Sequence, residues 1–346
     1  MANRRFTRLC GGLLAIAAIA LSGPIAYGDQ FFDNGGNDGL WTTPTNWELD
    51  TVPVAEQAAI YLVDEINALP LVGGIPTVTL SSGVQSITAF KLGQKNAADP
   101  GDIQLLVTGT AVLNLTADSN VGNGDSATGP QNYTSYLRQE GGTISQTGGT
   151  GVDVKLSASG AAFRPAGVFS IAGGTFTTTG TITLGGTGTV NQAGPAILEV
   201  DGSGATLIQT QDLKTENAGA VAIWRSIIDA GGITPVIVTD ELQMESLSFQ
   251  LALSAVPPVG DIILANADRI SNDNQFVGLP DGSDVSAPFG PNLYTWTINY
   301  FDSGSDGVII PAIVLSDLRV SPVPEPATFA LLGLGGLAML AVRRRR

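Results

Sequence analysis

Short runs of alternating apolar and polar residues, separated by glycine, fill the middle of the chain. Residues 169–176 (FSIAGGTF) and 198–207 (LEVDGSGATL) are examples. An alternation of period two places Ile, Leu, Val and Phe on one face of a β-strand and Thr, Ser and Gln on the other. Threonine is abundant over residues 175–189, and β-branched side chains suit a pleated surface. Helix signals are nearly absent between residues 70 and 320, so this part of the chain is predicted to be all-β.

The alternating runs recur at a nearly constant step. Leucines lead four similar segments in steps of 28, 29 and 29 along the sequence: Leu156, Leu184, Leu213 and Leu242. Glycine turns form a second series in steps of 32, 29 and 29: Gly141, Gly173, Gly202 and Gly231. A coil of about 29 residues cannot bury its apolar face alone, whereas stacked coils complete one another's core. The repeat favours a right-handed parallel β-helix (β-solenoid), and a β-sandwich is the alternative, because turn signals every ~8–12 residues fit both.

The N-terminal segment (1–28) has the pattern of a secretory signal peptide. Three arginines precede an apolar stretch at positions 9–21, and Ala26 and Gly28 are small residues at positions −3 and −1 of a cleavage site before Asp29. An uncleaved membrane anchor is the alternative, but the apolar run is short for a span. We therefore expect export and cleavage.

The end of the chain has three parts. The first is a tetrapeptide: Val323, Pro324, Glu325 and Pro326. Residues 327–342 are then apolar and uncharged, and as a helix they would extend about 24 Å, a little less than a ~30 Å hydrocarbon core. Four arginines close the chain and would hold it on the cytoplasmic side of a membrane: Arg343, Arg344, Arg345 and Arg346. We predict a transmembrane helix at 327–342, preceded by an extended segment that the prolines keep non-helical.

This three-part tail resembles the PEP-CTERM sorting signal. The resemblance implies export by the general secretory route and transient anchoring in the inner membrane. It further implies that an exosortase-type transpeptidase cuts near the Pro-Glu-Pro motif and transfers the protein to the cell surface or an exopolysaccharide matrix. The motif would then be a substrate for another enzyme. An ordinary single-pass anchor is the alternative.

Segments at both ends of the repeat region have features of solenoid caps. Trp41 and Trp47 lie in a Gly-x-Trp…Asn-Trp…Val-Pro phrase that resembles the first coil of autotransporter-like β-helix proteins. Residues 260–315 resemble the closing segment of the same proteins, although Pro311 interrupts the expected last strand. The predicted organisation is a signal peptide (1–28), an N-terminal cap (29–70), solenoid repeats (71–260), closing strands (261–321) and the sorting signal (322–346).

Composition removes several classes of chemistry. The chain has 346 residues, no histidine and one cysteine, Cys10, which lies in the predicted signal peptide. Catalytic Ser-His-Asp and Cys-His groups, histidine-ligated metals and disulfides in the mature part are therefore excluded. Seven of the 16 basic residues and none of the 31 acidic ones lie outside residues 29–326, which gives this part a net charge of −22. Such a surface repels nucleic acid and anionic lipid, so we expect membrane contact only through the C-terminal helix.

Two kinds of binding site remain as candidates. Glycine-rich acidic turns offer oxygen ligands for calcium, although their spacing also fits ordinary turns: Asp33, Asp38, Asp302 and Asp306. Exposed aromatic rings stack on sugars, and Tyr133 and Tyr136 lie in a looser stretch where a loop could protrude. We expect the tryptophans to cover the apolar ends of the solenoid instead. Apart from calcium, we expect no cofactor.

The expected function is non-catalytic. Glycoside hydrolysis needs two facing carboxylates, and the carboxylate clusters at residues 240–245 and 268–273 have no recognised spacing. We interpret the chain as an exported structural protein of the cell envelope or exopolysaccharide matrix. A carbohydrate-binding or adhesion module, assisted by calcium, is the alternative, and a polysaccharide-active enzyme is a distant third. A row of exposed aromatics on one solenoid face would favour the alternative, and a face of Thr, Ser and Asn would favour the scaffold.

Overall fold

The computed structural model describes eleven segments of the chain: 29–54, 57–62, 69–94, 102–124, 133–149, 151–157, 166–185, 195–215, 221–271, 275–301 and 311–323. The predicted signal peptide, with Ala26 and Gly28, and the predicted membrane helix at 327–342 lie outside these residues. Within the described segments, no helix has the length and apolar character that a membrane crossing needs.

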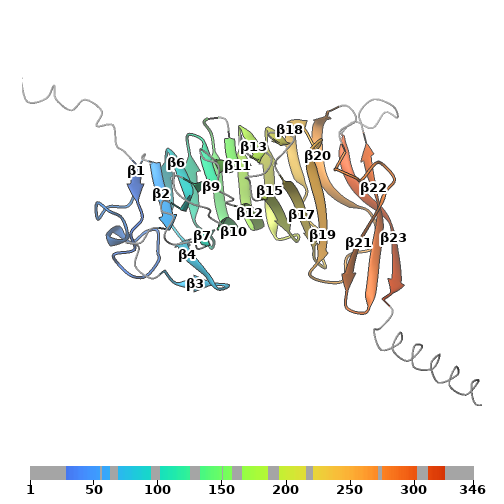
Figure 1. Ribbon diagram of the computed structural model, residues 1–346, viewed down its shortest axis with the longest axis horizontal. Coiled ribbons are helices and arrows are strands. Elements are labelled where there is room, and N and C mark those ends of the chain that lie inside the picture. The colour runs from blue at the N-terminus through green and yellow to red at the C-terminus, as the bar shows by residue number, and fades with distance from the viewer. Residues whose placement is uncertain are drawn as a thin grey trace, which may run out of the picture.

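The described chain is all-β and forms a β-solenoid of about five turns, which runs along the long axis of the molecule (Figure 1). Each coil passes through three strand positions, and strands of successive coils pair in parallel, so three stacks are built. Four strands each bend at a corner and belong to two stacks: β10 (Thr134–Gln146), β12 (Ala166–Thr178), β18 (Val236–Leu242) and β20 (Ile262–Ile270). The only helical structure among the described residues is a short 3-10 turn, η1 (Pro44–Asn46).

The members of the stacks are as follows. Stack A contains β4 (Ile75–Leu80), β7 (Ile103–Val107), the first halves of β10 (Thr134–Gln146) and β12 (Ala166–Thr178), β14 (Ala196–Asp201), β17 (Ala222–Ile228) and β19 (Leu247–Leu253). Stack B contains β5 (Val84–Ile87), β8 (Val112–Leu115), the second halves of β10 and β12, β15 (Ala205–Thr210) and the starts of β18 (Val236–Leu242) and β20. Stack C contains β1 (Asp29–Phe31), β2 (Gln57–Leu62), β6 (Ala89–Gln94), β9 (Ser119–Gly124), β11 (Gly151–Ser157), β13 (Thr181–Leu184), β16 (Asp212–Thr215) and the ends of β18 and β20 (Ile262–Ile270).

The alternation seen in the sequence sorts side chains between the core and the surface. In stack A, Leu137, Phe169, Leu198 and Trp224 occupy one inward column through four successive coils, and all four are completely buried. Their neighbours along each strand point outward. Each coil therefore supplies one layer of a continuous apolar core, which no single coil could enclose.

A glycine corner joins stacks A and B. Gly142 and Gly174 hold the same corner in successive coils with φ of 65° and 77°, a left-handed backbone that favours glycine. A Cβ atom on Gly174 would lie 2.3 Å from the carbonyl oxygen of Gly142. Glycine is therefore required at this corner for two reasons: the turn has a left-handed backbone conformation, and the adjacent coils approach too closely for a Cβ atom.

The predicted solenoid is confirmed, and its predicted leucine register is partly wrong. Leu213 pairs with Leu242 as expected. Leu184 instead pairs with Thr215, and Ile182 holds the position opposite Leu213. The coils differ in length, so the step read from the leucines is an average that does not fix the register. The parallel winding excludes the β-sandwich alternative for this body.

Aromatic side chains close the N-terminal end of the core. Trp41 and Trp47 are completely buried and Phe32 is 1% exposed; their rings meet edge to face, with centroids 4.9 Å apart for the two tryptophans and 5.0 Å apart for Phe32 and Trp47. The Trp41 amide donates to the carbonyl of Thr79 on β4, which gives the first strand of stack A a neighbour. A short hairpin of β3 (Leu71–Val72) with β4 adds to this edge.

An antiparallel sheet closes the other end. Strand β20 pairs with β23 (Ala312–Pro322), β23 with β22 (Asn292–Phe301) and β22 with β21 (Asp284–Phe289), all antiparallel. The sheet stands beyond the last coil at the C-terminal end of the rod (Figure 1). Phe276 fills the space under it, stacked on Phe249 at 4.9 Å between ring centroids. The domain boundaries predicted from the sequence remain predictions.

Candidate functional site

The outward face of stack B carries a row of small, uncharged polar side chains. Register pairing aligns five of them: Ser86, Asn114, Ser145, Thr177 and Gln209. Asn114 Nδ2 donates to Ser86 Oγ at 3.2 Å, and Thr177 Oγ1 donates to Ser145 Oγ at 3.4 Å. Neighbouring strands in a sheet are about 4.8 Å apart, so the row is a regular series of hydroxyl and amide groups. Four of the five are Ser, Asn and Thr, the residue types expected of a scaffold face, and Gln209 departs from that set.

A charged row crosses the outward face of stack A. Ser170 Oγ donates to Glu199 Oε1 at 2.8 Å, and Arg225 Nη1 contacts Glu199 Oε2 at 3.1 Å. Arg225 Nε also donates to Gln250 Oε1 at 3.0 Å. Both carboxylate oxygens of Glu199 are thus engaged by residues one coil before and one coil after it. The row connects four coils through side chains as well as through the backbone.

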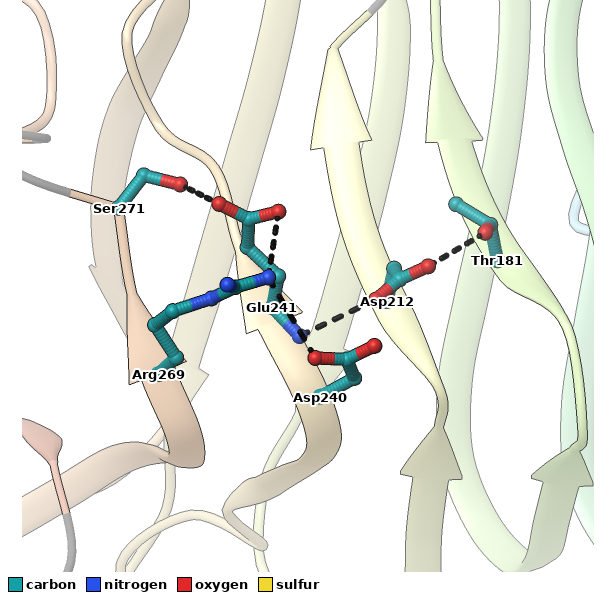
Figure 2. A network of polar contacts seen from close by, with 6 residues as sticks. All are labelled: Thr181, Asp212, Asp240, Glu241, Arg269 and Ser271. Carbon is teal, nitrogen blue, oxygen red and sulfur yellow. Dashed lines mark hydrogen bonds and ion pairs between the residues drawn. The ribbon is translucent and has the colours of Figure 1, made fainter.

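A third polar network lies on stack C and is drawn in Figure 2. Thr181 donates to Asp212 at 3.1 Å, and Asp212 accepts the backbone amide of Glu241 at 3.1 Å. Arg269 contacts Glu241 at 3.0 Å and Asp240 at 3.5 Å, and Ser271 donates to Glu241. The network therefore runs from β13 through β16 and β18 to β20.

Two of the carboxylates considered for glycoside hydrolysis, Asp240 and Glu241, belong to this network. The hydrogen bond from Ser271, aided by Gln243 and Arg269, outweighs burial and holds the pKa of Glu241 below its usual value. Such a carboxylate stays ionised, whereas a general acid needs a raised pKa. Glu245 and Asp268 are exposed, and Asp273 lies outside the described residues.

Sequence reasoning missed Asp201. Its burial, and then the nearby charge of Glu199, raise the pKa of Asp201 above its ordinary value. Because side chains alternate along β14, Glu199 and Asp201 lie on the same outward face, and the segment LEVD over residues 198–201 already carried this signal. Burial contributes most to the raised pKa of Asp201, and the nearby carboxylates of Glu199, Asp229 and Glu140 add repulsion that Arg138 opposes.

The candidate sugar platforms are mostly inside the protein. Trp41, Trp47, Trp224 and Trp296 are completely buried, as expected for residues that close the core. Tyr133 is 3% exposed, so its ring has no free face for a sugar. Tyr136 is half-buried against a small apolar cluster on the outward face of stack A: Val168, Ile197 and Ile223. Of the two tyrosines, only Tyr136 leaves part of its ring exposed, and the carbohydrate contact stays a prediction.

The predicted calcium turns are only partly described. Asp302 and Asp306 lie outside the described residues. Asp38 Oδ1 accepts the Leu40 amide at 2.9 Å and Asn46 Nδ2 at 2.6 Å, and Oδ2 accepts the Thr43 hydroxyl at 2.7 Å. Burial raises the pKa of Asp38, but these hydrogen bonds outweigh it and leave the pKa lowered.

The other described carboxylate of these turns is similarly engaged, because Asp33 Oδ1 accepts the Gly35 amide at 2.9 Å. Across the described part of the chain, no group of three or more acidic, cysteine or histidine side chains is placed to hold a metal ion. Both carboxylate oxygens of Asp38 and Oδ1 of Asp33 accept hydrogen bonds within the turn, and calcium binding stays a prediction.

The chain leaves the folded body at the terminal sheet. Strand β23 ends at Pro322, and the Val323 amide still donates to the carbonyl of Pro291 at 2.7 Å. Val323 is 40% exposed. The remaining residues of the predicted processing motif, Pro324, Glu325 and Pro326, and the four terminal arginines lie outside the described residues.

Comparison with known proteins identifies this tail and nothing else in the chain. Residues 322–346 match the PEP-CTERM protein-sorting motif. No curated protein and no solved structure matches the chain. The chain therefore carries a PEP-CTERM sorting motif behind a β-solenoid body, and the motif indicates an exported, envelope-directed protein that an exosortase-type enzyme processes.

Proposed function

We propose that the protein is a non-catalytic structural component of the cell surface or exopolysaccharide matrix. In this proposal the leader directs secretion, the C-terminal helix anchors the chain transiently in the inner membrane, and cleavage at the Pro-Glu-Pro motif releases the body to its final location. The solenoid is right-handed, in line with the usual hand of connections between parallel strands.

One observation supports the role of the body more than any other. The outward row on stack B is uncharged and regular, although the predicted mature part has a net charge of −22. A flat series of hydroxyls and amides makes many individually weak hydrogen bonds with a polymer that lies along it. The carbohydrate-binding alternative expected a row of exposed aromatics, and the tryptophans and Tyr133 are buried.

The proposal is tested by binding of the purified protein to the exopolysaccharide of its own cells. We expect sedimentation with the polymer, and we expect the double substitution Ser145→Glu with Thr177→Glu to weaken it several-fold by adding charge to the row. Ser286→Glu with Thr295→Glu adds the same two charges at directly opposed positions of the terminal sheet and is the matched control. Equal binding by the two variants would show that the row on stack B does not bind the polymer. Release of reducing ends or unsaturated sugars from the polymer would show that the protein is an enzyme.

A further inference from the structure

The fold and the sorting motif overlap. Strand β23 continues to Pro322, and the matched motif begins at that same residue. The amide of Val323, the first residue of the predicted tetrapeptide, is still bonded to Pro291. No linker therefore separates the folded body from the segment that a processing enzyme has to bind.

Strand β23 consists of two halves with different surroundings. In the first half, Ile313 and Leu315 are completely buried, and the backbone pairs with β20 on one side and β22 on the other. Asp317 then adopts a φ of 55°, where the pairing with β22 shifts in register. This irregularity is a β-bulge, which bends a strand and interrupts its ladder.

Beyond the bulge the strand is held on one side only. Residues 319–322 pair with β22 and with no other described strand, and Arg319, Val320, Ser321 and Pro322 are all exposed. Arg319 reaches across β22 and bonds to Asp284 on β21 and to Thr297 on β22. This ion pair is exposed at both ends, and such pairs contribute little to stability. Segments with few buried contacts open locally at low cost.

We propose that residues 319–323 are a releasable arm, which detaches from β22 before the processing enzyme takes the adjoining motif. An enzyme that cleaves the chain near the Pro-Glu-Pro motif also has to bind the backbone on the N-terminal side of the cut in an extended form, and β22 occupies backbone groups of residues 319–322 while the arm is paired. The inference rests on the proposed processing of the tail. The released arm adds about 16 Å of reach at ~3.3 Å per residue. Leu318 packs against the core at the start of the arm, so the opening is confined and the buried half of β23 stays in place.

The test locks the arm with a disulfide, which the mature chain otherwise lacks. Leu293 and Ser321 face each other across β22 and β23, and directly opposite residues of antiparallel strands lie within the Cα range of a disulfide. The variant Leu293→Cys with Ser321→Cys closes the arm. The control, Ser286→Cys with Thr295→Cys, joins β21 to β22 and leaves the arm free. Full-length chains are expressed in the native cells, and processing is followed by the shift of the chain to its shorter form.

We expect the locked variant to remain full-length in the membrane, with processing at least tenfold slower than in the control, and a reductant to restore it. Wild-type processing of a chain shown to be disulfide-bonded would overturn the inference. Arg319→Ala loosens the arm, so it should be processed as fast as wild type or faster, and slower processing would also overturn the inference.

A second measurement does not depend on the processing enzyme. In purified full-length protein, amide hydrogen exchange of residues 319–321 and Val323 should be at least a hundredfold faster than that of residues 313–315, and Arg319→Ala should accelerate the first set alone. Equal protection of both halves would contradict the releasable arm. If wild-type chains are never shortened in cells, the proposed function fails, whereas the exchange result still reports on the arm.

Discussion

The glycine corner offers a direct probe of coil stacking through Gly174→Ala. The added Cβ would lie 2.3 Å from the carbonyl oxygen of Gly142 in the preceding coil, whereas even a close C–H···O contact keeps carbon and oxygen about 3.3 Å apart. By the same comparison the two coils would have to separate by about 1 Å. Overpacking of this kind costs ~1–3 kcal/mol, and a side chain in the left-handed region costs a further ~1–2 kcal/mol. We expect a total loss of about 2–5 kcal/mol in the free energy of unfolding.

Gly83 provides the matched control because it isolates the backbone cost. Its φ of 80° resembles the 77° of Gly174, but it lies in the first coil, and the only atom near a Cβ there is the end of the Gln85 side chain at 3.9 Å. Gly83→Ala should lose only the ~1–2 kcal/mol of the left-handed backbone. Urea unfolding followed by far-UV circular dichroism gives both values. Equal destabilisation by the two substitutions would refute the close approach of the coils.

Three further predictions concern the core and the carboxylates. Trp224→Ala should lower the free energy of unfolding by ~3–5 kcal/mol in urea denaturation, because it empties a completely buried site under Phe276. Glu241→Gln should destabilise at pH 7, and the difference from wild type should shrink as the pH falls below 4.5, because the native carboxyl has a lowered pKa and its advantage is lost on protonation. Asp201→Asn should raise the melting temperature at pH 7 and lose this gain below pH 3.8, because the raised pKa of Asp201 means that its ionised form is disfavoured in the fold.

The solenoid could be predicted because its two main determinants are local in sequence. Short stretches of alternation define each strand, and glycine is required wherever a corner has positive φ and a neighbouring coil comes close, as at Gly174. The burial of Trp41 and Trp47 also followed from their size and from the need to close an apolar core.

The register could not be predicted because coil lengths vary. In the charged row of stack A, the sequence separation is 29 from Ser170 to Glu199, 26 from Glu199 to Arg225 and 25 from Arg225 to Gln250. Residues are gained or lost at corners, where nothing apolar needs to align, so the average step of the repeat says little about any one pair. For this reason Leu184 pairs with Thr215, and the expected pairing of Leu184 with Leu213 is not found.

The polar networks were beyond sequence reasoning for a related reason. Glu241 and Arg269 belong to successive coils and meet only because one coil lies directly on the next. The same holds for Arg319 and Asp284, which are joined across a strand of the terminal sheet. The charged residues could be named from the sequence, but their partners depend on the register between coils, which the repeat does not determine.

The central claim is that the solenoid is exported and that its C-terminal tail sorts it to the cell envelope. Mass spectrometry of both chain ends after cell fractionation tests this claim most directly. The account predicts that the protein in the envelope or extracellular fraction begins near Asp29, ends near the Pro-Glu-Pro motif and lacks residues 327–346. Full-length protein in the cytosol, with both ends intact, would contradict it.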